Sequence, residues 1–131
     1  MARRLAPGDI VLARFPEHLP SGHEQHGPRP ALVVGLPDLL GQPRFPVVLL
    51  TPLTTDRRQA WASRSPRLYP TLPAGADGLP VDSLALLDQT RSLDWERVAG
   101  YLGTLPSEAY RPIRDGLRTM LAGHAGSEPA P

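Results

Sequence analysis

The sequence has no cysteine and no long apolar run, and both absences limit what the protein can be. Without cysteine there are no disulfides, no thiol catalysis and no cysteine-ligated metal site. No segment approaches the roughly 18 consecutive apolar residues of a membrane span. Residues 1–7 carry two arginines but no apolar segment of a signal peptide. We therefore expect one cytoplasmic domain over residues 1–123, with no membrane contact, followed by a disordered tail over residues 124–131.

Lysine is absent as well, so all 14 basic side chains are arginines. The net charge of +1 is too small to indicate nucleic-acid binding by overall charge. Four arginines nevertheless cluster around Trp61, at positions Arg57, Arg58, Arg64 and Arg67. A guanidinium suits phosphate, and an aromatic ring can stack on a base. This segment is either a contact for single-stranded RNA or an ordinary solvated loop.

Apolar and β-branched segments separated by proline and glycine predict a chain built mainly of strands. The expected strands cover residues 8–15, 30–36, 45–53, 67–72 and 82–92. The intervening residues 16–28 and 54–66 are expected to be polar loops.

Two helices are expected after the last strand. Asp94 is a suitable N-cap and predicts a short helix through Tyr101. A longer helix is expected from about Thr104, because Tyr110, Ile113, Leu117 and Leu121 share one helical face. Pro112 and Gly116 weaken this second helix.

This pattern indicates a mainly β fold with a C-terminal helix, either a small bent sheet or a half-open barrel. The strands at 30–36 and 45–53 are apolar on both faces, so both faces need cover. One helix can cover one face, and a homodimer is expected to cover another.

The most informative segment is Gly22-His-Glu-Gln-His-Gly-Pro-Arg-Pro-Ala-Leu-Val-Val34. Prolines on both sides of Arg29 restrict the backbone and favour extended conformations. Arg29 is therefore held at the start of a strand, beside His23 and Glu24, which can exchange protons. These residue types predict a site for an anion, most simply a phosphodiester.

Several segments, in order, resemble the MazF/PemK (Kid-like) family of toxin endoribonucleases. Glu24-Gln-His-Gly-Pro-Arg-Pro30 matches the family pattern Glu-Gln-x-Gly-x-Arg-Pro. Ser83-Leu-Ala-Leu-Leu-Asp-Gln-Thr-Arg-Ser-Leu-Asp94 matches its Ser-x-x-Leu-x-Asp-Gln-x-Arg-x-x-Asp block. The remaining matches are Pro7-Gly-Asp-Ile-Val11, Leu50-Thr-Pro-Leu-Thr54 and Gly100-Tyr-Leu-Gly103.

The resemblance implies an SH3-like or CcdB-like barrel that forms a homodimer and binds an antitoxin with an acidic tail. It also implies cleavage of single-stranded RNA without a metal or other cofactor, leaving a 2′,3′-cyclic phosphate and a 5′-hydroxyl. By position, Arg29 and Thr54 are the family's catalytic residues. His23, Glu24 and Asp88 match positions used in some members. A branch that uses the aspartate has an arginine two residues earlier, where this chain has Leu86, which shifts weight to Arg29 and Thr54.

The chemistry of these side chains fits such a reaction. Arg29 offers several N–H donors to phosphoryl oxygens, and Thr54 adds a neutral donor. Histidine changes charge closest to neutral pH, so His23 is a natural proton carrier. Each residue also has a simpler interpretation. Arg29 could pair with Glu24, Thr54 could be a turn residue, and Asp88 could order the chain through Arg91.

The remaining expectations concern RNA contacts and alternatives. The residues expected to bind RNA are Gln25, Arg57, Arg58, Trp61, Arg64, Gln89 and Arg91. A zinc site at His18, His23 and His26 is disfavoured, because Pro20 and Gly22 prevent a regular ligand spacing. The alternative function is a non-catalytic barrel, either an RNA-binding module or a CcdB-like gyrase poison.

Overall fold

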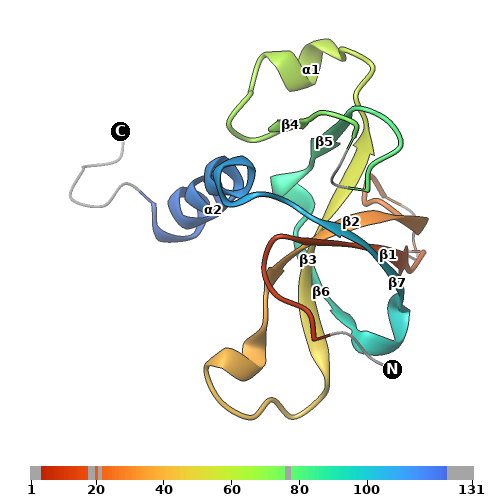
Figure 1. Ribbon diagram of the computed structural model, residues 1–131, viewed down its shortest axis with the longest axis vertical. Helices are drawn as coiled ribbons and strands as arrows, with labels where there is room; N and C mark the ends of the chain where they lie inside the picture. The colour runs from red at the N-terminus through yellow and green to blue at the C-terminus, as the bar shows by residue number, and fades with distance from the viewer. Residues whose placement is uncertain (1–3, 18–19, 21, 76–77, 124–131) are drawn as a thin grey trace.

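The structure, a computed structural model, describes residues 4–17, 20, 22–75 and 78–123. Within these residues the chain forms a seven-stranded antiparallel sheet and one long C-terminal helix (Figure 1). The strands are β1 (Asp9–Phe15), β2 (Gly27–Gly35), β3 (Val47–Thr55), β4 (Thr71–Leu72), β5 (Ser83–Ala85), β6 (Arg91–Asp94) and β7 (Val98–Thr104). The helices are α1 (Ala60–Ser63) and α2 (Ser107–Ala122), with 3-10 turns η1 (Pro37–Leu39), η2 (Leu87–Gln89) and η3 (Trp95–Arg97). The mainly β class with a C-terminal helix is confirmed.

Strand β3 organises the sheet because it pairs along both of its edges. The strand order is β4-β5-β3-β2-β1-β7, and β6 also pairs with β3. β2 lies along one edge of β3, while β6 and then β5 occupy the other. The side chains at the end of β3 therefore lie between the start of β2 and the β5–η2 segment.

The single strand expected over residues 82–92 is wrong, and Pro52 explains the break. The segment forms β5, turns through η2 and resumes as β6. The interruption lies opposite Pro52, whose carbonyl accepts a hydrogen bond from Leu86 N at 3.0 Å. Proline has no N–H to return a bond, so the ladder cannot continue there. The chain leaves the sheet and places Asp88 on the η2 turn.

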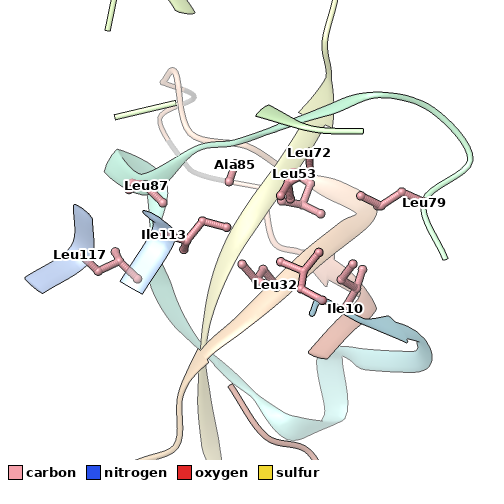
Figure 2. Packing of buried hydrophobic residues seen from close by; sticks show 10 residues of the cluster. Ile10, Leu32, Leu53, Leu72, Leu79, Ala85, Leu87, Ile113 and Leu117 are labelled. Carbon is pink, nitrogen blue, oxygen red and sulfur yellow. The ribbon is translucent and has the colours of Figure 1, made fainter. Parts of the chain in front are cut away.

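Alternating side chains on the central strands build two buried clusters. Ile10 and Leu32 belong to one, whereas their neighbours Val11 and Val33 belong to the other. Successive residues of a strand point to opposite faces of a sheet, which explains the division. Helix α2 covers the first cluster through Ile113 and Leu117 (Figure 2).

Helix α2 runs unbroken through the two residues expected to weaken it. Pro112 is exposed on the helix surface. Gly116 faces the sheet side, where an added Cβ would lie 2.8 Å from Leu87 Cδ1 and 3.3 Å from Arg67 O. The glycine lets the helix pack closely against η2. The helix begins at Ser107, three residues later than Thr104, because Thr104 still belongs to β7.

The short helix expected from Asp94 to Tyr101 is wrong. The Asp94 carboxylate does act as a cap, accepting from Glu96 N at 2.9 Å, but the turn that it starts is only η3. The chain then continues as β7, which pairs with β1. Two further differences are smaller: the strand expected over 67–72 is only β4, and the loop 54–66 contains α1.

The described helices include none that is long and apolar enough to cross a membrane. The tail expected over residues 124–131 lies outside the described residues.

Candidate active site

Arg29 and Thr54 line one cleft, which we call the Arg29 cleft. Its volume is about 380 Å³. Arg29 comes from the start of β2 and Thr54 from the end of β3, two strands that are neighbours in the sheet. Arg57 and Ser83 line the same cleft. The pairing of an arginine with a threonine, expected from the sequence, is therefore present in space.

Arg29 is half-buried and poorly satisfied by the protein. Its Nη2 donates to the carbonyl of His26 at a long 3.4 Å. Its Nε is buried and, within the described residues, has no hydrogen-bond partner. Burial lowers the pKa of the guanidinium from its ordinary value, because the charged form loses solvation. A charged group in this condition gains from an anion that supplies acceptors.

The simpler interpretation of Arg29, an ion pair with Glu24, is not seen among the described side chains. Glu24 is exposed and lines a different cleft from Arg29. The guanidinium therefore keeps its charge uncompensated by that carboxylate.

A second cleft, the His23 cleft, gathers the candidate proton carriers. It has a volume of about 360 Å³ and is lined by His23, Glu24, Asp88, Gln89, Thr90 and Arg91. The first two residues come from the loop before β2, and the others from η2 and the start of β6. Asp88 is thus brought to the same cleft as His23 and Glu24 although it is far from them in sequence. The Arg29 hydrogen bond to His26 O joins Arg29 to the loop that carries His23 and Glu24.

Gln89 fixes the loop that carries His23. Its Nε2 donates to His23 O at 3.1 Å, and its Oε1 accepts from Gln25 N at 2.8 Å. Both ends of the side-chain amide are therefore used to hold the loop backbone. The RNA contact expected of this side chain stays a prediction, and the two hydrogen bonds give it a role in shaping the cleft.

Asp88 has a partner that the sequence did not indicate. Tyr69 donates its hydroxyl proton to Asp88 Oδ2 at 2.6 Å. The hydrogen bond to the carboxylate, with burial and the negative charge of Asp88, raises the pKa of Tyr69 to about 12. Tyr69 follows α1 and immediately precedes Pro70, a position with no recognisable motif.

The basic loop, residues 55–59, is ordered rather than free in solvent. Arg58 N donates to Asp56 Oδ1 at 2.9 Å, and Arg57 N donates to Gln59 Oε1 at 2.8 Å. Arg58 has a positive φ of 59°, a conformation that costs free energy for a residue with a side chain. The hydrogen bonds within the loop hold it there. Arg57 is thereby placed in the Arg29 cleft, and Arg58 lines a pocket of about 410 Å³ beside α1.

Trp61 belongs to this region as an aromatic pair with Tyr69. The ring centroids are 4.9 Å apart and the planes are nearly perpendicular, at 83°. Trp61 keeps 44% of its surface exposed, so it also presents a face to solvent. Arg64, at the end of α1, is exposed. The contact with single-stranded RNA expected at these positions stays a prediction.

No group of three or more metal-ligating side chains occurs within the described residues. His18, one member of the disfavoured zinc set, lies outside them.

The antiparallel sheet with one C-terminal helix defines a small, mainly β protein of the barrel type, with one cleft that contains Arg29 and another that contains His23. The model of the PemK-like, MazF-like toxins of type II toxin-antitoxin systems matches residues 6–121. The chain belongs to this family.

Solved structures agree with this assignment. MazF from Deinococcus radiodurans (Form-I) has a TM-score of 0.69 and 30% sequence identity, over 92% of this chain and 99% of that chain. The same organism's MazE-MazF (Form-II) has a TM-score of 0.62 and 30% identity, over 89% and 95%. An endoribonuclease in complex with its cognate antitoxin, from a mycobacterial species, shares the fold at a TM-score of 0.63 and 19% identity, over 98% and 100%. No curated protein sequence matches the chain.

Proposed function

We propose that the protein is the toxin of a toxin-antitoxin pair and a sequence-specific endoribonuclease that cleaves single-stranded RNA without a metal. The observation that carries the proposal is the half-buried Arg29 guanidinium in one cleft with Thr54, while His23, Glu24 and Asp88 line a second cleft. These groups can neutralise a phosphodiester and move protons around it. The alternative, a non-catalytic barrel, gives no reason for these residues to lie together.

The proposed reaction is a transesterification within the RNA. The 2′-oxygen attacks the adjacent phosphorus, and the bond from phosphorus to the 5′-oxygen breaks. The proton of the 2′-hydroxyl passes to a base, and an acid returns a proton to the leaving oxygen. The products are a 2′,3′-cyclic phosphate and a 5′-hydroxyl. The nucleophile is already held close to phosphorus by the ribose, so no metal is needed to generate it.

Arg29 and Thr54 take the role of stabilising the phosphorane. An arginine presents N–H donors in a fixed fork, which matches two oxygens of a phosphoryl group. Donors held in place before the reaction act on the charge that develops in the transition state. Burial strengthens this interaction, because water screens it less.

Proton transfer belongs to the His23 cleft. His23 is the natural carrier at neutral pH, and Glu24 and Asp88 can accept a proton or orient the imidazole. RNA reaches the clefts across the basic loop and α1, where Arg57, Arg58 and Arg64 contact phosphates and Trp61 stacks on a base. Gln25 and Arg91 complete the contact surface around the His23 cleft.

We also propose that the protein acts in the cytoplasm as a homodimer and is silenced by a cognate antitoxin. The MazE-MazF structures from Deinococcus radiodurans and the mycobacterial complex support an antitoxin partner. An acidic antitoxin segment on Arg29 and Arg57 would compete with RNA phosphates for the same guanidinium groups.

The deciding experiment incubates the purified protein with a long unstructured RNA in excess EDTA and determines the chemistry of the fragment ends. Discrete cuts with a cyclic phosphate are expected from the wild-type protein and none from Arg29→Ala. Arg111→Ala is the matched control, since Arg111 is exposed on α2. Intact RNA from a folded wild-type protein would falsify the proposal and favour the RNA-binding module or the gyrase poison.

A further inference from the structure

Tyr69 contacts Asp88 but takes no direct part in the proposed reaction. The hydroxyl of Tyr69 lies 2.6 Å from Asp88 Oδ2, within the range of a short charge-assisted hydrogen bond. The two residues are separated by 19 positions in sequence. Tyr69 lies in the segment between α1 and β4, and Asp88 lies in the η2 turn.

The hydrogen bond from Tyr69 orients the Asp88 carboxylate more than it stabilises the fold. Asp88 is exposed, and an exposed polar pair contributes little to the free energy of unfolding. An aspartate on a three-residue turn would otherwise sample several rotamers. A donor at a fixed place selects one of them. Within the described residues no other hydrogen bond reaches the Asp88 side chain, which leaves Oδ1 available to a ligand.

Tyr69 is itself held in place by Trp61. The two rings pack edge to face, with centroids 4.9 Å apart. The chain beside it is tied to η2 as well, because Leu87 N donates to Leu68 O at 3.3 Å. The Tyr69 hydroxyl therefore has little freedom to leave Asp88.

We propose that Tyr69 is a positioning residue that holds the Asp88 carboxylate at the His23 cleft in the orientation that proton transfer requires. The inference rests on the proposed ribonuclease function. It adds a residue that no family motif in the sequence includes. It also connects the basic loop, through Trp61 and Tyr69, to a candidate proton carrier.

The charged surroundings of the pair are mixed in sign. Asp56 and Arg58 line the pocket on the Tyr69 side. His23, Glu24 and Arg91 line the cleft on the Asp88 side. The raised pKa of Tyr69, about 12, keeps its hydroxyl protonated across the neutral range, so the donor persists under working conditions.

A double-mutant cycle on the full-length chain tests the inference through RNA cleavage. Tyr69→Phe removes only the hydroxyl and is expected to lower kcat about tenfold with little change in KM, the scale of one hydrogen bond to a charged group. In the Asp88→Asn background the same change should have less than about a twofold effect, because the residue acts through Asp88. Tyr110→Phe, on α2, is the matched control and should retain full activity.

The outcomes separate this inference from the proposed function. A wild-type protein that leaves RNA intact refutes the ribonuclease and the inference with it. An active wild-type protein with a fully active Tyr69→Phe variant refutes only the inference. The same holds if Asp88→Asn is fully active, or if the loss from Tyr69→Phe is equal in both backgrounds.

A spectroscopic titration tests the hydrogen bond between Tyr69 and Asp88 without any RNA. Tyrosinate absorbance is followed against pH in the wild-type protein and in Asp88→Asn. The Tyr69 hydroxyl is expected to ionise at lower pH in the variant, since its hydrogen bond to the carboxylate is the largest cause of the raised pKa. Asp38→Asn, an exposed aspartate on η1, is the control and should leave the curve unchanged. Identical curves for wild type and Asp88→Asn would show that the contact is absent and overturn the inference.

Discussion

The side chain of Gln89 and the backbone of Gln25 are joined across 64 positions of sequence by a 2.8 Å hydrogen bond. A second bond from the same amide, to His23 O at 3.1 Å, completes a clamp on the loop before β2. Between residues 22 and 26, the described part of the loop next to β2, the chain forms no helix or strand. The position of His23 therefore depends on a residue of η2.

Gln89→Ala should free this loop. Loss of two hydrogen bonds is expected to speed amide exchange at Gln25 by at least about tenfold and to reduce RNA cleavage. Hydrogen–deuterium exchange measured by NMR gives the first quantity directly. Gln42→Ala, in the exposed β2–β3 turn, is the control. Unchanged protection at Gln25 in the Gln89 variant would contradict the clamp.

Thr104→Val should destabilise the fold through Asp9. Asp9 is buried, and its Oδ1 accepts from Thr104 Oγ1 at 2.7 Å. The Thr104 hydroxyl has one proton, so Tyr101, whose hydroxyl lies 2.6 Å away, donates to it. Valine removes the donor from a buried carboxylate, which we expect to lower the free energy of unfolding by about 1–3 kcal/mol. Urea unfolding measures the change.

The control for that substitution is Thr71→Val, on the exposed edge strand β4, which should change stability by less than about 0.5 kcal/mol. Equal effects at both positions would show that the loss comes from the threonine side chain in general and not from the Asp9 contact.

Gly116→Ala should destabilise the protein although alanine favours helices. The added Cβ would meet Leu87 Cδ1 at 2.8 Å and the backbone oxygen of Arg67 at 3.3 Å. Leu87 is in the core and cannot move freely. We expect a net loss of about 1 kcal/mol after the gain in helix propensity. Gly100→Ala is the control and should be tolerated, because no atom lies within 4 Å of the added Cβ. Thermal unfolding of both variants measures the difference, and equal melting temperatures would contradict the close packing at Gly116.

Stability should fall at alkaline pH in a way that depends on Tyr69. Its folded-state pKa, about 12, is above the ordinary value of 10.0, so the protonated form is favoured by folding. That contribution is complete below pH 10 and is lost as the pH rises toward 12. Because the pair is exposed, the effect is small: urea midpoints taken between pH 8 and pH 11.5 should fall slightly more steeply for the wild-type protein than for Tyr69→Phe. Parallel curves would argue against the hydrogen bond to Asp88.

Arg29→Lys keeps the charge but removes the fork of donors. If the guanidinium binds two phosphoryl oxygens, kcat should fall by about 100-fold. Arg111→Lys is the control on exposed α2, and single-turnover cleavage is the measurement. A lysine variant close to wild-type activity would show that Arg29 supplies charge alone.

The central strands could be predicted because their signals are local. β1, β2 and β3 are apolar, β-branched and bounded by proline or glycine. β1 and β3 begin within two residues of the expected place, whereas β2 begins at Gly27, three residues earlier than expected and inside the segment expected to be a loop. β7 was missed because Asp94 caps the η3 turn as it would cap a helix. What makes Val98–Thr104 a strand is its pairing with β1, which is distant in sequence.

The candidate site divides in the same way. The prolines around Arg29 and the match to a family motif indicated the residue, and the structure places it in one cleft with Thr54. The roles of these residues in catalysis stay predictions. The contact from Tyr69 to Asp88 and the clamp by Gln89 could not be foreseen, because each joins segments that only the folded sheet brings together.

The pairing of β1 with β7 sets a condition on when the chain can fold during its synthesis. Asp9 lies opposite Thr104, and the cluster that contains Ile10 is closed by Leu117 of α2. Contacts this far apart in sequence form only after both partners have left the ribosome. A nascent chain must therefore be translated through α2 before the cluster that contains Ile10 can close.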